Sequence, residues 1–333
     1  MPVDFEQGPW LLPAFIQALM SRGSFTEKDA KIIIGELLAA SDLSYEPEDL
    51  QEVLENLVSV ARQNLSRLDY DVRIALDQTS GERVYCFVNT VSDLATQLAT
   101  TYNSDELAFI RRLLVAMFAT YNTQRMEVMA LTKQQCLRLG RAPNSTQASL
   151  DEDENEPPQS QVAHRSITHG DVNRIMDELV AMGWMAHSDQ GFYTLATRGL
   201  SELAPWLVNT FNDGDQVTWQ RIKNCIACRE ILTQGQRCAN VDCLVRLHDR
   251  CAVTMFASHR EKKCSICKMP WTGKNYVGER AITEGRLYQQ SRGMRGRQSN
   301  VADQAFEEQN GRMDDGEDEG QEEEPEEDEE ESE

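Results

Sequence analysis

The feature that most constrains the fold of this chain is a cluster of eight Cys and His residues in its C-terminal third. Seven of the nine cysteines fall within 43 positions, from 225 to 267. In a reducing compartment such a cluster indicates metal binding rather than disulfides. The spacing defines four ligand pairs along the chain: Cys225 and Cys228, Cys238 and Cys243, His248 and Cys251, and Cys264 and Cys267.

Zinc suits these ligands because it prefers four soft or borderline donors in a tetrahedron, with Zn–S near ~2.3 Å and Zn–N near ~2.0 Å. If the pairs interleave, Cys225, Cys228, His248 and Cys251 hold one ion, and Cys238, Cys243, Cys264 and Cys267 hold the other. Closed four-ligand sites leave no position for water, so both ions are structural. A finger of about 50 residues buries too little surface to fold alone, and metal binding supplies its folding free energy. The sequence therefore predicts a cross-braced finger of the RING type.

The remaining Cys and His residues lack such a pattern. His259 could replace His248, but its spacing would break the pairing. We expect three further histidines at the surface: His164, His169 and His187. The two isolated cysteines, Cys86 and Cys136, are expected to be small buried apolar residues.

The strong negative charge of the chain belongs to one end. The net charge is −22, and residues 314–333 hold fifteen Asp or Glu and no Lys or Arg, which leaves about −7 elsewhere. No apolar run reaches the ~18 residues of a membrane span. The acidic start, Met1 to Glu6, lacks the basic and apolar regions of a secretory signal. We expect a soluble intracellular protein without membrane contact.

Residues 1–100 predict three helices and a hairpin. Helical periodicity runs from Leu11 to Arg22, Thr26 is a candidate cap for a second helix, and a third begins near Pro47. Alternating apolar residues at 70–76 and 84–88 then flank a Thr-Ser-Gly turn. Three helices followed by a hairpin is the order of a winged helix.

The same order recurs in residues 101–212. We predict a helix capped by Ser104, a second from about Met126 to near Gly140, and a third opened by Asp171. A short hairpin follows at 183–195, then a helix at about 198–211. The composition of 141–163 predicts a disordered insertion.

These patterns together predict an α+β chain. Two tandem winged-helix domains occupy 1–100 and 101–212, and the zinc finger occupies 220–275. Residues 280–333, which are rich in Arg, Gly and Gln and then strongly acidic, are predicted to be disordered.

Tandem winged helices followed by a four-Cys, one-His, three-Cys finger resemble the non-SMC element 1 family, over about residues 8–275. This family is the RING-like subunit of the SMC-five/SMC-six genome-maintenance complex. The segments that carry the resemblance are Gln17–Gly23, Phe192–Leu195 with Leu200 and Leu203, and Gln234–Cys238 leading into His248 and Cys251. The resemblance implies a RING-type ubiquitin ligase subunit that acts in the nucleus, in DNA repair and recombination. It also implies a MAGE-homology partner and contact with a kleisin subunit.

In such a ligase the finger docks a ubiquitin-charged conjugating enzyme and orients its thioester, and it supplies no catalytic residue. Docking requires a small apolar patch around the first and last ligand pairs. The candidates are Ile226, Ala227, Met255, Phe256, Ile266, Met269, Pro270 and Trp271. Ala227 stands where a larger aliphatic residue is usual and Ser265 where Pro is common, and both weaken the expected contact. Trp271 either compensates in part or covers the second zinc.

Three alternatives remain open from the sequence. A PHD finger has the same ligand order but normally places Trp two residues before the seventh ligand; this chain has Lys262 there, which argues against a PHD finger. The finger could instead be purely structural within the same complex. Residues 220–275 hold eleven Lys or Arg against four Asp or Glu, which allows weak contact with DNA phosphates, although a solvated basic face explains this surplus better.

Overall fold

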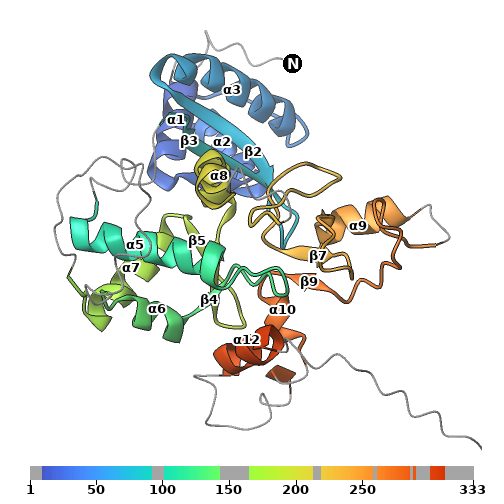
Figure 1. Cartoon of the computed structure of the whole chain (residues 1–333). Coiled ribbons are helices and arrows are strands. Elements are labelled where there is room, and N and C mark those ends of the chain that lie inside the picture. The colour runs from blue at the N-terminus through green and yellow to red at the C-terminus, as the bar shows by residue number, and fades with distance from the viewer. Residues whose placement is uncertain are drawn as a thin grey trace, which may run out of the picture.

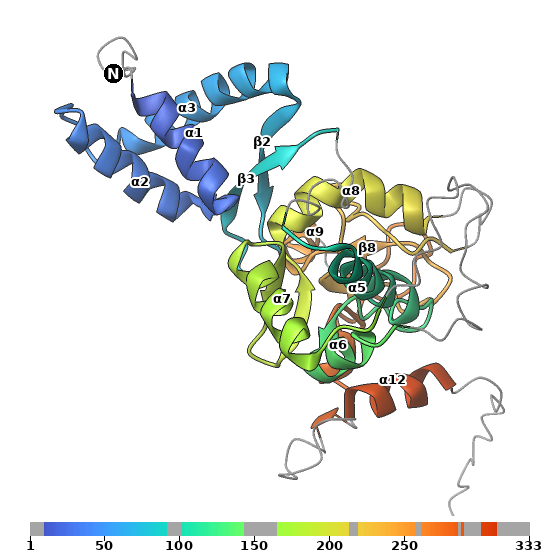
Figure 2. The same cartoon turned by 90° about the vertical axis from the view of Figure 1, so that its left-hand side faces the viewer.

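The computed structural model describes residues 10–91, 101–142, 165–212, 219–257, 261–285, 288–289 and 301–311. Figures 1 and 2 show an N-terminal unit, a second unit, a finger and short C-terminal helices. Residues 143–163 of the predicted insertion 141–163, the acidic residues 314–333, His164 and His259 lie outside the described residues. No helix in the described ranges has the length and apolar character needed to cross a membrane.

The N-terminal unit packs three helices against one face of a three-stranded sheet. The elements are α1 (Leu11–Arg22), β1 (Ser24–Thr26), α2 (Glu27–Ala40), α3 (Leu50–Leu65), a 3-10 turn η1 (Ser66–Leu68), β2 (Tyr70–Leu76) and β3 (Arg83–Asn89). The sheet order is β1-β3-β2, antiparallel throughout. Apolar residues from every layer close the core, among them Phe15, Ile34, Leu54 and Val72, each fully buried. Their burial is the main stabilising contribution to this unit.

Two predicted helix starts in this unit can be compared with the structure. Thr26 caps α2 as predicted, because its Oγ1 accepts a hydrogen bond from the Asp29 amide at 3.2 Å. The third helix starts three residues later than predicted. The segment around Pro47 is a turn closed by the Asp49 amide on the Glu46 carbonyl at 3.0 Å, and the helix begins at Leu50.

The second unit repeats the element order of the first. It consists of α5 (Ser104–Val115), a π-helical turn η2 (Ala116–Thr120), β4 (Leu131–Thr132), α6 (Lys133–Leu139), α7 (His169–Ala181), β5 (Met185–His187), β6 (Phe192–Leu195) and α8 (Thr197–Phe211). The sheet order is β4-β6-β5. In both units the order is helix, strand, helix, helix, strand, strand, and the last strand occupies the centre of the sheet.

The helix predicted from Met126 to Gly140 is wrong over its first half. Residues 126–130 contain no helix and only an isolated β-bridge at Glu127, all five are buried, and Met129 has a left-handed φ of 43°. The helix α6 begins only at Lys133, where Thr132 and Gln135 form a reciprocal capping box. Apolar residues at 126–131 therefore reflect a segment enclosed on all sides rather than one face of a helix.

Two helix caps in the second unit differ slightly from prediction. Asn103, one residue before Ser104, caps α5 through a capping box with Glu106. Thr168 caps α7, and Asp171 is the third residue of that helix rather than its opening residue. Both shifts leave the predicted helix in place, because the acidic residue that marked it occupies the first turn.

The helix α8 joins the two units. It follows β6 of the second unit and packs on the sheet of the first, opposite the side covered by α1 to α3 (Figure 1). The Asn89 amide donates to Glu202 Oε1 at 3.1 Å, and Thr197 Oγ1 donates to Asp77 Oδ2 at 2.9 Å. Cys86 lies fully buried beneath this helix, and burial raises the pKa of its thiol to about 12. The prediction that Cys86 is a small buried residue is confirmed, as it is for Cys136.

Part of the segment predicted to be disordered is helical. The short helix α10 (Arg280–Thr283) and the helix α12 (Val301–Gly311) fall within 280–333. Ala302, Ala305 and Phe306 pack with Ile282 and Phe192 in a small separate core. Asp303 accepts hydrogen bonds from Gln135 Nε2 at 2.6 Å and Tyr121 Oη at 3.2 Å. A low overall apolar content conceals a single apolar stripe of helical spacing, which is why composition predicted disorder here.

Candidate metal centre

The finger contains two tight turns of the same construction, each carrying one Cys-X-X-Cys pair. The Cys225 amide donates to the Glu230 carbonyl, and the Arg229 amide donates to the Cys225 carbonyl, both at 2.8 Å. In the second turn, the Cys264 amide donates to Met269 and the Lys268 amide to Cys264. Arg229 and Lys268 hold φ values of 65° and 63°, in the left-handed region that non-glycine residues seldom adopt. This strained position follows each second cysteine and turns the chain so that both sulfurs face one point.

The remaining ligands come from the strands and helix between these turns. The finger comprises β7 (Gly235–Arg237), β8 (Arg246–Leu247), α9 (Asp249–Phe256) and β9 (Tyr276–Val277), with sheet order β8-β7-β9. Cys238 follows β7 directly, His248 stands between β8 and α9, and Cys251 lies in the first turn of α9. The strand β9 extends the finger slightly beyond the predicted limit at residue 275.

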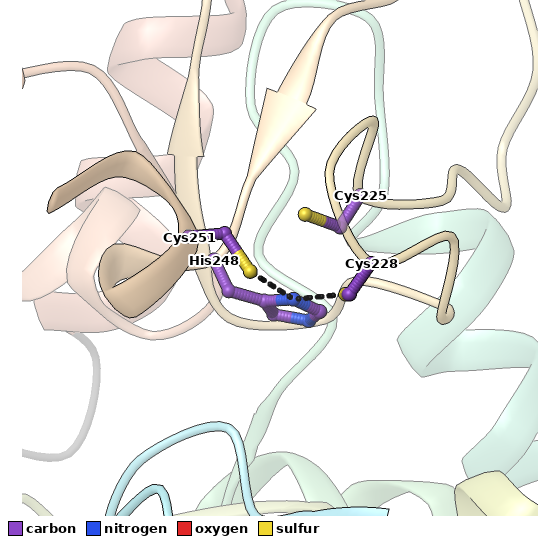
Figure 3. A group of neighbouring side chains, drawn as sticks. All are labelled: Cys225, Cys228, His248 and Cys251. Carbon is purple, nitrogen blue, oxygen red and sulfur yellow. Dashed lines mark hydrogen bonds between the residues drawn. The ribbon is translucent and has the colours of Figure 1, made fainter. Parts of the chain in front are cut away.

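The first predicted ligand set converges. The ligand atoms of Cys225, Cys228, His248 and Cys251 all lie within 4.8 Å of one another. The Nδ1 atom of His248 lies 3.3 Å from the Cys228 sulfur and 4.0 Å from the Cys251 sulfur (Figure 3). The sulfurs therefore face Nδ1 of the imidazole. His248 Nε2 is buried and has no hydrogen-bond partner among the described residues.

The second predicted set converges in the same way. The sulfurs of Cys238, Cys243, Cys264 and Cys267 also lie within 4.8 Å of one another. Cys238 and Cys267 approach to 3.3 Å, and Cys243 and Cys264 to 3.6 Å. Chain order assigns the first and third pairs to one set and the second and fourth to the other, so the two sets interleave as predicted.

These distances fit zinc. A tetrahedron with Zn–S near ~2.3 Å places its sulfurs about 3.8 Å apart, and about 3.6 Å from a coordinated imidazole nitrogen. The observed separations of 3.3 to 4.0 Å bracket those values. Both sets therefore fit the zinc-binding sites of a RING-like domain, and each ion would be a structural cross-link with no open coordination position.

The pKa values of the thiols also fit a site that needs a bound cation. Burial raises the pKa of Cys238 and Cys251 to about 12. For Cys225, burial opposes ionisation, but hydrogen bonds from His248 and from backbone amides outweigh it and lower the pKa of the thiol to about 5. Without a cation, crowded thiols resist joint ionisation because each thiolate repels the next. A divalent ion binds thiolates and removes that obstacle.

A buried cluster of charged residues lies beside the second set and was not predicted from the sequence. Glu127 of the second unit is 1% exposed and receives the side chains of Arg246, Lys223 and Arg237, all buried. Arg246 Nε donates to Glu127 Oε2 at 2.8 Å, and its Nη1 donates to the Cys243 carbonyl at 2.6 Å. Nearby cations and the hydrogen bond from Arg246 outweigh burial and lower the pKa of Glu127. The cluster fixes the finger to the second unit.

The hairpin of the first unit holds the finger from another side. Gln78, at the tip between β2 and β3, accepts from the amides of Thr233 and Gln234 at 3.0 and 2.9 Å. Its Nε2 donates to the Ile231 carbonyl at 2.9 Å. Arg250 of α9 donates to the Gly81 carbonyl at 2.5 Å. The finger is therefore oriented by both preceding units.

The predicted docking residues divide into exposed and buried groups. Ile226, Ile266 and Met269 are 37, 68 and 45% exposed, and Ala227 and Pro270 are also exposed. Met255 is half-buried. Phe256 and Trp271 are buried, with ring centroids 5.7 Å apart, and Trp271 Nε1 donates to Gln236 Oε1 at 2.9 Å. These two residues support the finger from within, so they were wrongly included in an exposed docking patch.

The fold and the two interleaved sites define a zinc-binding protein of the RING-like class. A family model described as a RING-like domain matches residues 225–267. A second family model, described as the Nse1 non-SMC component of the SMC5-6 complex, matches residues 13–203, more than half of the chain. The chain belongs to this Nse1 family, and the sequence-based resemblance is confirmed.

Individual relatives agree with this assignment. The non-structural maintenance of chromosomes element 1 homolog of Homo sapiens is 22% identical over 287 residues, covering 85% of this chain and 93% of that protein. Its counterpart in Schizosaccharomyces pombe is 21% identical over 229 residues, covering 68 and 80%. Among solved structures, a chain of an "Nse1-Nse3-Nse4 complex" matches with a TM-score of 0.59 and 23% identity, covering 79% of this chain and 96% of that one.

Proposed function

We propose that this protein is a RING-type E3 ubiquitin ligase subunit of an SMC-five/SMC-six chromosome-maintenance complex. The observation that carries the proposal is the exposure of Ile226 and Ile266 on the two matching Cys-X-X-Cys turns of a RING-like finger. Apolar side chains on these turns form the surface at which a RING domain docks a ubiquitin-charged conjugating enzyme. The ligase acts by orienting the thioester for attack, which is catalysis by positioning.

We assign two structural zinc ions to the finger. Cys225, Cys228, Cys251 and Nδ1 of His248 would hold one, and the four sulfurs of Cys238, Cys243, Cys264 and Cys267 the other. The ions supply folding free energy and fix the two turns relative to each other. With Phe256 and Trp271 assigned to the interior and Met255 half-buried against the same core, we restrict the docking surface to Ile226, Ala227, Ile266, Met269 and Pro270.

The assembly partners follow from family membership and from the matched solved structure, a complex of Nse1 with Nse3 and Nse4. We infer that this chain binds a MAGE-homology subunit of the Nse3 type and a kleisin of the Nse4 type, in the nucleus, in DNA repair and recombination. We interpret the two N-terminal units as winged helices, since both have that element order. The acidic surface of α3 suits a protein partner better than DNA. We expect the exposed lysines of the finger to contact DNA phosphates only weakly.

A structural role without ligase activity is the second candidate. The finger is fixed by Gln78 and Glu127 from two directions, as expected of a rigid support. The small residues Ala227 and Ser265 also reduce the apolar area that a conjugating enzyme could bury. We favour the ligase because both isoleucines on the two turns are exposed and neither belongs to a hydrophobic core of the described residues.

A ubiquitin-discharge assay separates the two candidates. Zinc-loaded protein, with and without its MAGE-type partner, is added to a panel of ubiquitin-charged conjugating enzymes, and thioester loss is followed. We expect acceleration with at least one enzyme, and Ile226→Ala or Ile266→Ala to reduce it about tenfold or more, because central apolar contacts dominate binding energy.

The matched control is Ile32→Ala, which removes an equally apolar side chain that is 53% exposed on α2, remote from the finger. It should discharge ubiquitin at the wild-type rate. A folded two-zinc sample that accelerates no enzyme, alone or with its partner, would favour the structural role.

A further inference from the structure

The strand β2 differs from the other edge strands of this molecule. Among the described strands, those at sheet edges have two or three residues: β1, β4, β5, β8 and β9. β2 has seven, and no described strand pairs with its outer side. Proteins usually protect a long edge with proline, lysine or a bulge, because its free amides and carbonyls can capture another strand. From Tyr70 to Leu76, β2 has no proline or lysine, and its register with β3 is unbroken.

The ladder shows which backbone groups point outward. Asp77 donates to the Glu82 carbonyl at one end of the hairpin, and Thr90 donates to the Asp69 carbonyl at the other. Because bonded and non-bonded pairs alternate along an antiparallel ladder, the even-numbered residues of β2 direct their amides and carbonyls away from β3. The Phe87 amide, opposite Val72, accordingly donates to Gly23 of the other neighbour. The Asp71 carboxylate accepts a hydrogen bond from the outward Val72 amide. The outward amides of Ile74 and Leu76 are therefore the ones that a new strand could pair with.

The side chains beside these free groups are apolar and exposed. Ile74 and Leu76 are 47 and 52% exposed, and as alternate residues they lie on the face that carries Val72. A groove of about 370 Å³ opens between Ile74 and α3, with Val58 and Tyr85 among its lining residues. A strand added to β2 would place alternate side chains over this groove.

The charge beside the groove selects the occupant. Glu52 and Glu55 are exposed on α3, and Glu55 lines the groove. Two arginines also lie here. Arg62 lines the groove and is paired with Asp71 at 2.9 Å, and Arg83, opposite Leu76 on β3, is paired with Glu27 at 3.3 Å, so each is matched by a carboxylate that does not line the groove. A second copy of this chain would bring the same acidic helix with it, which disfavours self-pairing. The surface suits an extended segment with apolar residues at alternate positions and basic residues beside them.

We propose that the outer edge of β2 is a docking site for an extended, basic and apolar segment of a partner protein, which adds a fourth strand to the first sheet. The backbone hydrogen bonds at Ile74 and Leu76 supply affinity, and the groove beside α3 selects the side chains. The inference rests on the proposed assembly with a MAGE-type and a kleisin-type subunit, one of which would supply the segment.

Hydrogen exchange at single amides tests this edge in the full zinc-loaded chain, alone and with the two partner subunits added separately and together. In the free chain the Arg73 and Ala75 amides should be protected, while those of Ile74 and Leu76 exchange rapidly. Addition of the subunit that supplies the strand should slow exchange at Ile74 and Leu76 at least tenfold.

Two variants complete the test. Ile74→Pro removes only an outward amide and keeps the ladder with β3, which protection of Ala75 would verify. Ile74→Lys keeps the amide but adds a charge that opposes an incoming basic segment. Each should weaken binding of that subunit at least tenfold without changing zinc content, whereas Ile32→Lys, the same change at another exposed isoleucine, should leave binding unaltered.

The outcomes distinguish this inference from the proposed function. If the complex assembles while the Ile74 and Leu76 amides stay unprotected, the proposed docking at β2 is wrong and the proposed function is unaffected. The same holds if assembly tolerates Ile74→Lys as well as Ile32→Lys. If the wild-type chain binds neither subunit, both the proposed assembly and the proposed docking site on β2 are contradicted. Concentration-dependent dimerisation that protects these amides without a partner would instead identify a second copy as the occupant.

Discussion

At the scale of single residues, the metal sites depend on backbone conformation as much as on ligand identity. Arg229 and Lys268 adopt left-handed φ angles that a side chain with a Cβ seldom occupies. Amide hydrogen bonds within each turn oppose this local cost, and the zinc ion that we propose for each site would oppose it further. Without the ions, the hydrogen bonds alone would hold the two strained turns.

The change Cys251→Ser should disrupt the first site. The variant loses a sulfur from a closed four-ligand set, so we expect bound zinc to fall from two ions per chain to one or fewer, with loss of protection in α9. Metal content measured by atomic emission checks the result. The control Cys136→Ala alters a buried cysteine remote from the finger and should retain both ions. Two ions in the Cys251→Ser protein would contradict the ligand assignment.

The sequence predicts the ligands well and their surroundings poorly. Spacing predicts the four ligand pairs, because ligands separated by two to four residues can share a turn, and the structure brings alternate pairs together. Glu127 gives no such signal, since its partner Arg246 lies 119 positions away and an isolated glutamate looks like any surface residue. Phe256 and Trp271 were misplaced because an apolar residue near a zinc ligand can face outward or inward with the same spacing.

At the scale of elements, predictions succeed where one face is buried and fail where a segment is enclosed or short. The helices α2, α3 and α7 and the hairpins follow their periodicity. Residues 126–130 contact neighbours on successive sides, so their apolar character has no helical or strand period. The helix α12 is short and its flanking composition is polar, so only its contact with Phe192 and Ile282 identifies it.

The helix α8 carries a carboxyl group whose burial affects stability. Glu202 is 7% exposed, and burial raises the pKa of its carboxyl group despite the Asn89 amide and Arg198 beside it. The folded chain thus holds this proton to a higher pH than the unfolded chain, where the pKa is about 4.3. The resulting stabilisation exists at acidic pH and is lost as pH rises through the folded pKa.

Replacing Glu202 by Gln should remove this penalty. At pH 8 we expect the free energy of unfolding to rise by on the order of 1 kcal/mol relative to wild type. Below about pH 4 the Glu202 carboxyl group is largely protonated in both the folded and the unfolded chain, and the gain in stability should disappear. Urea denaturation across this pH range provides the measurement, and Glu52→Gln, at an exposed position on α3, is the control. A variant that is less stable at pH 8 than at pH 4, relative to wild type, would show that the ionised carboxylate is favoured in the fold.

At the scale of the whole molecule, the finger is an integral part of a three-part structure. The Glu127 cluster joins it to the second unit, and Gln78 joins it to the first. A finger held in this way presents its exposed turns in one direction relative to the two N-terminal units, which a flexible tether could not do.

The change Glu127→Ala should release the finger from the second unit. It leaves three buried cations without their carboxylate, and breaking a buried ion pair typically costs about 3–5 kcal/mol. We expect a lower free energy of unfolding and a larger radius of gyration by small-angle scattering, with two zinc ions retained. The control is Glu261→Gln, an exposed position of the finger that is paired with Lys263. Unchanged scattering and stability would assign the orientation of the finger to Gln78 and Arg250 instead.

The contact between Gln78 and Ile231 joins residues 153 positions apart, and this has a consequence for the order of assembly during synthesis. The first hairpin leaves the ribosome long before the finger exists, so its tip remains hydrated while the second unit and α8 are made. Domains generally fold from the N-terminus as they emerge, and non-local contacts form last because a long loop must close first. Capture of zinc then becomes the step that permits the final closure. We therefore expect newly made chains in zinc-starved cells to stall with two folded units and an open hairpin tip.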